Sequence, residues 1–303
     1  MSDNVPTETR CGFVAVIGAP NAGKSTLVNA LVGTKVSIVS HKVQTTRMPV
    51  RGIAIEGGSQ IVFIDTPGIF TPRRRLDRAM VDAAWGGAGD ADIVVLVADA
   101  ARPDDADVAP VLEKLSGLSL PRVLALNKID LVSKPVLLQQ AARFNSEVPF
   151  AATFMVSALN GEGVSDLRAY LGTSVPPGPW HYPADEISDM PLRLLAAEIT
   201  REKIFALLHQ ELPYETAVET TGWKEQKNGV RIEQTIYVER PSQRRIVLGE
   251  GGRMIKKLSM EARGELSHLF EQPVHLFLFV KVKEGWGDDP DRYRDIGLEF
   301  PKK

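Results

Sequence analysis

The feature that most constrains this chain is an eight-residue stretch near its N-terminus, Gly18-Ala19-Pro20-Asn21-Ala22-Gly23-Lys24-Ser25. An apolar run, residues 13–17, precedes it, and a run of helical character begins at Thr26. A strand, a glycine-rich turn and a helix form the context in which the pattern G-x-x-x-x-G-K-[ST] binds phosphate groups. Backbone N–H groups and the helix N-terminus face the anion, Lys24 reaches the outer phosphates, and Ser25 offers a hydroxyl to Mg²⁺. The stretch predicts a nucleotide-phosphate site; a chance glycine-rich turn is the alternative.

Short apolar runs alternate with helical stretches from Cys11 to about Leu171. Strands are predicted at residues 53–55, 61–64, 93–98, 123–126 and 154–156, and helices near residues 76–85, 108–115, 136–144 and 164–171. Continuous apolar strands separated by helices indicate an α/β domain whose mostly parallel sheet is covered on both faces. Ligands of such domains bind beyond the carboxyl ends of the strands, so reactive residues are expected directly after them.

The tetrapeptide Asp65-Thr66-Pro67-Gly68 follows the strand predicted at residues 61–64. An aspartate at that strand end can hold a Mg²⁺-bound water, and the Gly68 amide can meet a terminal phosphate. Taken alone, these four residues are a good turn sequence. Downstream of a phosphate-binding loop they predict the second Mg²⁺ element.

Two further strand ends carry residues suited to a guanine base, Asn127-Lys128-Ile129-Asp130 and Ser157-Ala158-Leu159. A carboxylate at Asp130 accepts hydrogen bonds from the N1–H and 2-amino groups of guanine. Adenine lacks both donors and would leave the carboxylate unpaired, at a cost of about 1–3 kcal/mol. We expect Asn127 at the purine edge, Lys128 along the ring, and a backbone N–H of residues 157–159 at the guanine oxygen. A surface loop is the alternative for each of these segments, but four such elements in this order favour a GTP site.

These elements together resemble the Era group of translation-factor-related GTPases, with Gln44-Thr45-Thr46-Arg47 as the first switch. The resemblance implies GTP or GDP and Mg²⁺ as ligands, with Ser25, Asp65 and a threonine as metal ligands. Either Thr46 or its neighbour Thr45 closes on the Mg²⁺ ion and the terminal phosphate, and the residues leave this choice open. Catalytic roles are implied for Lys24, Thr46, Gly68 and Asn21.

Two positions bear on the rate of hydrolysis. Ile69 and Phe70 stand where Ras-like enzymes carry a glutamine that orients the attacking water, so we expect slow intrinsic hydrolysis. Asn21 matches the asparagine that helps to bind K⁺ in related GTPases, so the resemblance implies K⁺ stimulation. Shaping the loop is the alternative role of Asn21.

Residues 174–190 are rich in proline and predict a linker. The domains expected on this basis are a flexible N-terminus at 1–10, a GTPase domain at 11–173, the linker at 174–190, and a second domain with its C-terminal tail at 191–303. In the second domain, the sequence pattern predicts a helix over 192–211 and strands over 214–221 and 230–239, joined by a turn at 227–229. It also predicts a final strand over 274–282.

The second domain carries a local basic region. Residues 240–257 hold six Lys or Arg residues and one acidic residue, a charge of about +5 on a chain whose net charge is −2. Within them, Gly249-Glu250-Gly251-Gly252 forms a Gly-x-x-Gly pattern, which lets the backbone of a turn lie against a nucleic-acid strand. An ordinary helix–helix turn is the alternative for this pattern alone. The order helix–β–β–helix–turn–helix–β resembles an α+β KH domain of the prokaryotic type.

The KH resemblance implies an RNA site made by Arg244, Arg245, Gly249, Glu250, Gly251, Gly252, Arg253, Lys256, Lys257 and Trp286. Glu250 departs from the basic residue common in this turn and weakens the phosphate cradle. Trp286 can stack on a base or cap the core, and the sequence does not distinguish these two interpretations. With both domains, the resemblance implies a GTP-switched assembly factor that binds the 3′ end of small-subunit ribosomal RNA and acts on the small ribosomal subunit.

The amino-acid composition indicates which general class of protein this chain belongs to. At 303 residues, 44% hydrophobic and 24% charged, the chain has the make-up of a globular protein. The single Cys11 forms no intrachain disulfide, and no apolar run approaches the ~20 residues of a membrane span. We expect a cytoplasmic monomer, and the resemblance adds weak peripheral membrane association. The alternatives are an RNA scaffold with negligible hydrolysis, which intact Lys24 and Asp65 oppose, and an ATP-using phosphate-loop enzyme, which Asp130 opposes.

Overall fold

The structure is a computed structural model that describes residues 9–72, 74–209, 212–286, 289–295 and 297–301. Most of the N-terminus predicted to be flexible, residues 1–10, lies outside these ranges. The chain divides into two compact units at Asp189–Met190, and the described residues from Gly297 onward group with the first unit. This differs from the predicted division, which assigns the tail to the second domain. Within the described ranges, no helix is long and apolar enough to cross a membrane.

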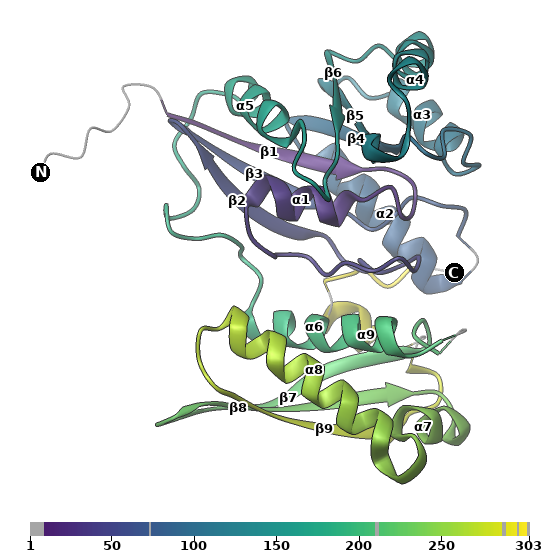
Figure 1. The fold of residues 1–303 in the computed structure, drawn as a ribbon, viewed down its shortest axis with the longest axis vertical. Helices are drawn as coiled ribbons and strands as arrows, with labels where there is room; N and C mark the ends of the chain where they lie inside the picture. The colour runs from purple at the N-terminus through teal and green to yellow at the C-terminus, as the bar shows by residue number, and fades with distance from the viewer. Residues whose placement is uncertain (1–8, 73, 210–211, 287–288, 296, 302–303) are drawn as a thin grey trace, which may run out of the picture. The chain divides into compact units, whose positions relative to one another are not determined.

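The first unit is built on a six-stranded sheet in the order β2-β3-β1-β4-β5-β6 (Figure 1). The strands are β1 (Arg10–Ile17), β2 (Val50–Glu56), β3 (Ser59–Asp65), β4 (Ile93–Asp99), β5 (Arg122–Asn127) and β6 (Ala152–Val156). β2 runs antiparallel to β3, and the other four pairings are parallel. This confirms the predicted mostly parallel sheet.

Helices cover both faces of this sheet, α1 (Lys24–Val32) and α5 (Val164–Ser174) on one, and α2 (Arg75–Gly89), α3 (Val108–Ser116) and α4 (Lys134–Glu147) on the other. Because successive strand residues point to opposite faces, β1 contributes to two cores. Val14 and Val16 pack with Leu27 of α1, whereas Ala15 and Ile17 pack on the side of α2 and α3. The strands are therefore apolar throughout, as predicted for a doubly covered sheet.

Residues 175–189 lie along the first unit rather than standing free as a linker. At the outer edge of the sheet, the Ile53 N–H donates to the Ile187 carbonyl oxygen at 2.9 Å. Gln60 is fully buried; its Oε1 accepts from the Tyr182 N–H at 3.0 Å, and its Nε2 donates to the Tyr182 carbonyl oxygen at 2.8 Å. The proline-rich segment thus finds its hydrogen-bond partners on β2 and β3.

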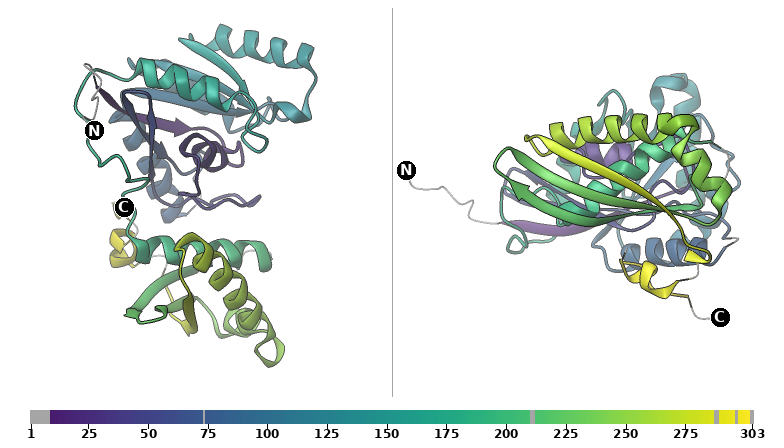
Figure 2. Two further views of the ribbon diagram at one scale, coloured as in Figure 1. Left: turned by 60° about the vertical axis from the view of Figure 1, so that its left-hand side comes forward. Right: turned by 90° about the horizontal axis from the view of Figure 1, so that it is seen from below.

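The second unit is a three-stranded sheet with helices against one face. It comprises α6 (Leu192–Leu207), β7 (Thr216–Gln226), β8 (Gly229–Val238), α7 (Pro241–Leu248), α8 (Arg253–Leu269), β9 (Val274–Val282) and the short α9 (Pro290–Asp295). β8 lies in the centre, antiparallel to β7 and parallel to β9. Ile204, Ile236, Val247 and Leu258 form the core between sheet and helices. The predicted element order is confirmed, and Figure 2 gives two further views of these elements.

Candidate functional site

The phosphate-binding loop connects β1 to α1 at the carboxyl end of the sheet. Gly23 has a φ of 93°, and a Cβ there would lie 2.2 Å from Asn127 Nδ2, so this position requires glycine. The Lys24 ammonium is buried and donates to the carbonyl oxygens of Gly18 at 3.1 Å and Ala19 at 2.9 Å. Burial lowers the pKa of Lys24 to about 8, because the charged form loses hydration. The loop therefore holds a cation at the place where a phosphate chain would bind.

Three oxygen-bearing side chains meet beside this loop. The Ser25 hydroxyl lies 2.9 Å from Thr46 Oγ1, which donates to Asp65 Oδ2 at 3.5 Å. Asp65 is fully buried, which raises the pKa of its carboxyl group, and its Oδ1 has no hydrogen-bond partner in the described structure. A buried carboxylate oxygen aimed beside two hydroxyls fits Mg²⁺, which prefers hard oxygen ligands and completes its shell with water and phosphate oxygens. No cluster of three His, Cys, Asp or Glu among the described residues could hold a metal by itself.

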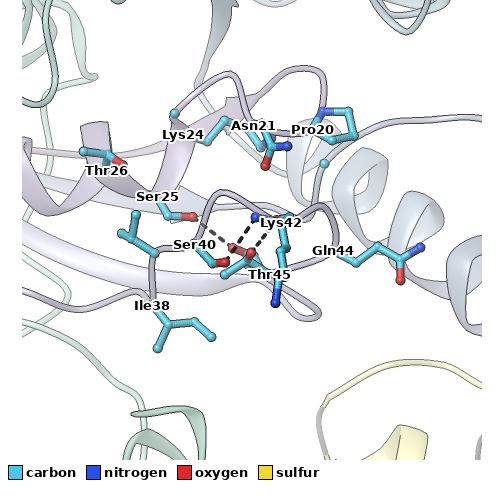
Figure 3. A pocket seen from close by; sticks show the side chains of 14 residues that line it. Pro20, Asn21, Lys24, Ser25, Thr26, Ile38, Ser40, Lys42, Gln44 and Thr45 are labelled. Atoms are coloured by element: carbon cyan, nitrogen blue, oxygen red, sulfur yellow. Dashed lines mark hydrogen bonds between the residues drawn. The ribbon is translucent and has the colours of Figure 1, made fainter. Parts of the chain in front are cut away.

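The structure separates the two threonines of the first switch. The Thr46 hydroxyl faces Ser25 and Asp65, whereas the Thr45 hydroxyl donates to the Lys42 carbonyl oxygen at 2.7 Å. Figure 3 shows the segment around Thr45 facing the phosphate-binding loop across a pocket lined by both. Of the two candidates left open by the sequence, Thr46 is the one beside the expected Mg²⁺ ligands.

The residues expected to bind guanine gather at the ends of β5 and β6. Asp130 is exposed, and its Oδ1 accepts a hydrogen bond from Ser157 Oγ at 2.6 Å. Asn127 also has a structural role: its Nδ2 donates to the Ala22 carbonyl oxygen at 2.9 Å, and its Oδ1 accepts from the Ala158 N–H at 3.0 Å. Asn127 therefore ties the phosphate-binding loop to the loop after β6.

The other expected nucleotide contacts divide into pocket-lining and supporting residues. The pocket lining includes Pro20, Asn21, Thr26 and Gly68. Thr66 is fully buried, and its hydroxyl donates to the Val16 carbonyl oxygen at 2.8 Å, which joins the ends of β3 and β1. Pro67 is buried beside it, and the Leu159 side chain is exposed after β6.

The Gly-x-x-Gly turn joins α7 to α8, as predicted. Gly249 has a φ of 71°, and a Cβ there would lie 2.7 Å from the Cβ of Met254, so a larger residue would strain the turn. The cationic residues around it, Arg240, Arg244, Arg245, Arg253, Lys256 and Lys257, are all exposed. Glu250 pairs with Arg253. The N-terminus of α8 thus lies among cations, an arrangement suited to backbone phosphates.

Comparisons with known proteins agree with both sites. A family described as 50S ribosome-binding GTPase matches residues 13–128, and the KH domain family matches residues 211–287. The GTPase Era of Afipia carboxidovorans is 61% identical and aligns over 100% of both chains. The GTPase Era of Rhizobium meliloti is 63% identical over 97% of this chain and 94% of its own. The chain belongs to the Era family of GTPases.

Solved Era structures share the fold of nearly the whole chain. The crystal structure of Era in complex with MgGDPNP and nucleotides 1506–1542 of 16S ribosomal RNA matches with a TM-score of 0.91 and 36% identity, covering 95% of this chain and 99% of that one. A variant of Aquifex aeolicus Era bound to GDP·AlF4⁻ matches with a TM-score of 0.90 at the same identity and coverage.

Asp99, at the end of β4, supports the nucleotide site of this Era-family chain and was missed by the sequence analysis. Its Oδ2 lies 2.6 Å from the Nζ of Lys128, which also donates to the Asn21 carbonyl oxygen at 2.8 Å. Burial acts to raise the pKa of Asp99, but hydrogen bonds from Lys128 and the Ala101 N–H outweigh it and keep the pKa below its usual range. The rule that reactive residues follow strands pointed to this position, but a single aspartate carries no recognisable motif.

The structure contradicts one expected RNA contact. The Trp286 indole is buried, with 6% of its surface exposed, and its Nε1 donates to the Glu215 carbonyl oxygen at 3.1 Å. Stacking on a base requires an open ring face. Trp286 therefore caps the core of the KH unit in this Era-family protein.

Proposed function

We propose that this chain is a GTP-switched assembly factor of the small ribosomal subunit that hydrolyses GTP and binds the 3′ end of small-subunit ribosomal RNA. The observation that carries the proposal is that one chain combines residues suited to phosphate, Mg²⁺ and guanine with a basic Gly-x-x-Gly hairpin. The Era protein solved with nucleotides of 16S ribosomal RNA has the same fold over 95% of this chain, which supports the same class of RNA.

The nucleotide site acts through residues already in position. Lys24 would bind the outer phosphates of GTP, and Asp130 would select guanine, with its carboxylate oriented by Ser157. Ser25, Thr46 and Asp65 would hold Mg²⁺, which when bound neutralises charge on the phosphates. Because Thr46 belongs to the switch segment, GTP would order that segment and hydrolysis would release it.

Hydrolysis by this site is proposed to be slow without a partner. Ile69 is 5% exposed and packs into the core on the α2 side of the sheet. An apolar side chain cannot orient the attacking water. Asn21, whose side chain lies in the pocket lining in Figure 3, is the proposed K⁺ ligand that would stabilise the developing charge.

RNA would bind along the hairpin formed by α7, the Gly-x-x-Gly turn and α8. The exposed arginines and lysines contact phosphates, and the turn lets the backbone approach them. The Glu250–Arg253 pair offsets one of these cations, so the turn itself contributes less positive charge than its neighbours. We also propose that the protein is a cytoplasmic monomer that associates weakly with the inner face of the cell membrane.

A binding experiment with a matched control tests the RNA assignment. Anisotropy of a labelled RNA copying the 3′ end of small-subunit ribosomal RNA is measured with a non-hydrolysable GTP analogue and with GDP. We expect tighter binding in the GTP form and a loss of about tenfold or more in Gly249→Asp, which places a carboxylate where phosphates would lie. Gly264→Asp adds the same charge to α8 at an exposed position with open space around it. Equal RNA affinity of the two variants would refute the assignment.

A further inference from the structure

The three-stranded sheet has an outer face opposite its helices. Phe277 and Phe279 of β9 are 41% and 49% exposed on this face, whereas their neighbours Leu276 and Val280 point inward and are buried. Strand residues of a half-covered sheet normally alternate apolar-in and polar-out. Two large rings on the solvent side break this pattern, so they indicate an interaction surface.

The strand register places basic side chains on both sides of the two rings. Lys224 of β7 lies opposite Arg231 of β8, and Arg231 lies opposite His275 of β9, so the three form a row across the sheet. On the other side of the rings, Tyr237 lies opposite Lys281. A nucleic-acid strand that follows β9 would therefore meet a basic row, two rings and a further cation in turn.

Arg231 and Phe277 already form a stacked pair. The guanidinium carbon lies 4.2 Å from the centroid of the Phe277 ring. Glu233, on the same face, pairs with Arg231 at 2.7 Å and fixes the guanidinium. Aromatic rings and guanidinium planes are the surfaces on which proteins stack unpaired RNA bases. The outer face is thus arranged like a base-stacking platform on a sheet.

We propose that this face, which we call the stacking face (Arg231, Tyr237, His275, Phe277 and Phe279), binds unpaired bases of single-stranded RNA. Lys224 and Arg231 on one side of the rings and Lys281 on the other favour RNA, because these cations pair with phosphates while the rings stack on bases. The face adjoins the basic hairpin, because Arg244 of α7 donates to the carbonyl oxygen of Val280, the residue after Phe279, at 3.2 Å. The inference rests on the proposed function for its class of ligand, and extends the RNA site beyond the Gly-x-x-Gly turn.

The test compares two RNAs on the full chain. A tetranucleotide matches the four nucleotides that a KH turn clamps, and an RNA of about 20 nucleotides is long enough to continue over the sheet. Phe277→Leu with Phe279→Leu keeps apolar side chains but removes both rings. We expect this variant to bind the long RNA about tenfold or more weakly and the tetranucleotide as tightly as the parent chain.

Two control variants separate stacking from other causes. Phe277→Tyr with Phe279→Tyr keeps the ring faces and should bind the long RNA like the parent chain. Met260→Ala removes an exposed apolar side chain from α8, 58% exposed, and should change neither affinity. Circular dichroism and thermal unfolding of each variant confirm that the fold is retained.

The outcomes distinguish this inference from the proposed function. Parent-like binding of the long RNA by the leucine variant overturns the stacking face, and would leave it as a surface for a protein. Equal loss for both RNAs also overturns it, because the tetranucleotide reports on the hairpin alone. If instead Gly249→Asp leaves all RNA binding unchanged, the hairpin assignment fails, while length-dependent loss in the leucine variant would still support stacking.

Discussion

Removing the charge of Asp99 tests how Lys128 is held in the nucleotide site. Asp99 Oδ2 lies 2.6 Å from Lys128 Nζ, and the two side chains are 7% and 30% exposed. Asp99→Asn keeps an oxygen for the Ala101 N–H, which Oδ1 accepts at 2.9 Å. Asp99 Oδ2 also accepts from Arg102 Nε at 3.1 Å, so the variant removes both ion pairs of Asp99 and leaves the turn at Ala101 in place.

The expected magnitude follows from the type of hydrogen bond that is lost. A bond to a charged partner contributes about 1.5–3 kcal/mol, and a neutral one about 0.5–1.5 kcal/mol. The difference of about 1–1.5 kcal/mol is an upper limit for the effect on nucleotide binding, because Lys128 retains its bond to Asn21. We expect the Kd for GTP and for GDP to rise together by about three- to tenfold.

Titration with a fluorescent GDP analogue and competition by GTP measures both constants. Asp104→Asn is the matched control, because the Asp104 side chain is 81% exposed and pairs with Arg143 instead. A double-mutant cycle with Lys128→Met isolates the pair. Unchanged affinity in Asp99→Asn, or additive effects of the two substitutions, would refute the idea that Asp99 acts through Lys128.

Three further predictions follow from the same structure. Asp130→Asn should shift the preference from GTP to xanthosine triphosphate, since an amide donates where the carboxylate accepts; an unchanged preference in competition assays would show that Asp130 does not read the base. Burial lowers the pKa of Lys24 to about 8, and phosphate favours the charged form of this side chain. GTP affinity measured by calorimetry should therefore fall about fourfold from pH 7 to pH 8.5, and an affinity that does not change with pH would contradict this. Gln60→Ala should lower the free energy of unfolding by about 2–4 kcal/mol, because the backbone N–H groups of residues 181 and 182 lose their acceptor. In the same denaturant titrations, the exposed control Gln139→Ala should change this free energy by less than about 0.5 kcal/mol.

The strands and motifs of the nucleotide domain were predictable because their signals are local. Each apolar run is short and ends in a polar residue, and a parallel sheet brings such ends to one edge. Asp65 and Asp130 were found by this rule, and Ser157 contacts Asp130 as the common edge requires. The KH order was predictable for the same reason, since its turn signals are separated by clear periodic runs.

Contacts that depend on how the chain folds in three dimensions could not be predicted from the sequence. Thr45 and Thr46 have the same chemistry, and the turn made by Lys42 decides which hydroxyl faces Asp65. The fit of residues 175–189 to the first unit depends on Gln60, more than a hundred residues earlier in the chain. Trp286 could equally have stacked or packed until its surroundings were known.

GTP turnover in K⁺ buffer, with and without RNA copying the 3′ end of small-subunit ribosomal RNA, tests most directly whether the GTPase and the RNA site act together. We expect slow hydrolysis that accelerates with this RNA in the parent chain and in Gly264→Asp. Gly249→Asp should keep the slow basal rate but lose the acceleration. A basal rate unaffected by RNA, together with no retention of RNA by the parent chain, would leave a GTPase and contradict the ribosomal role.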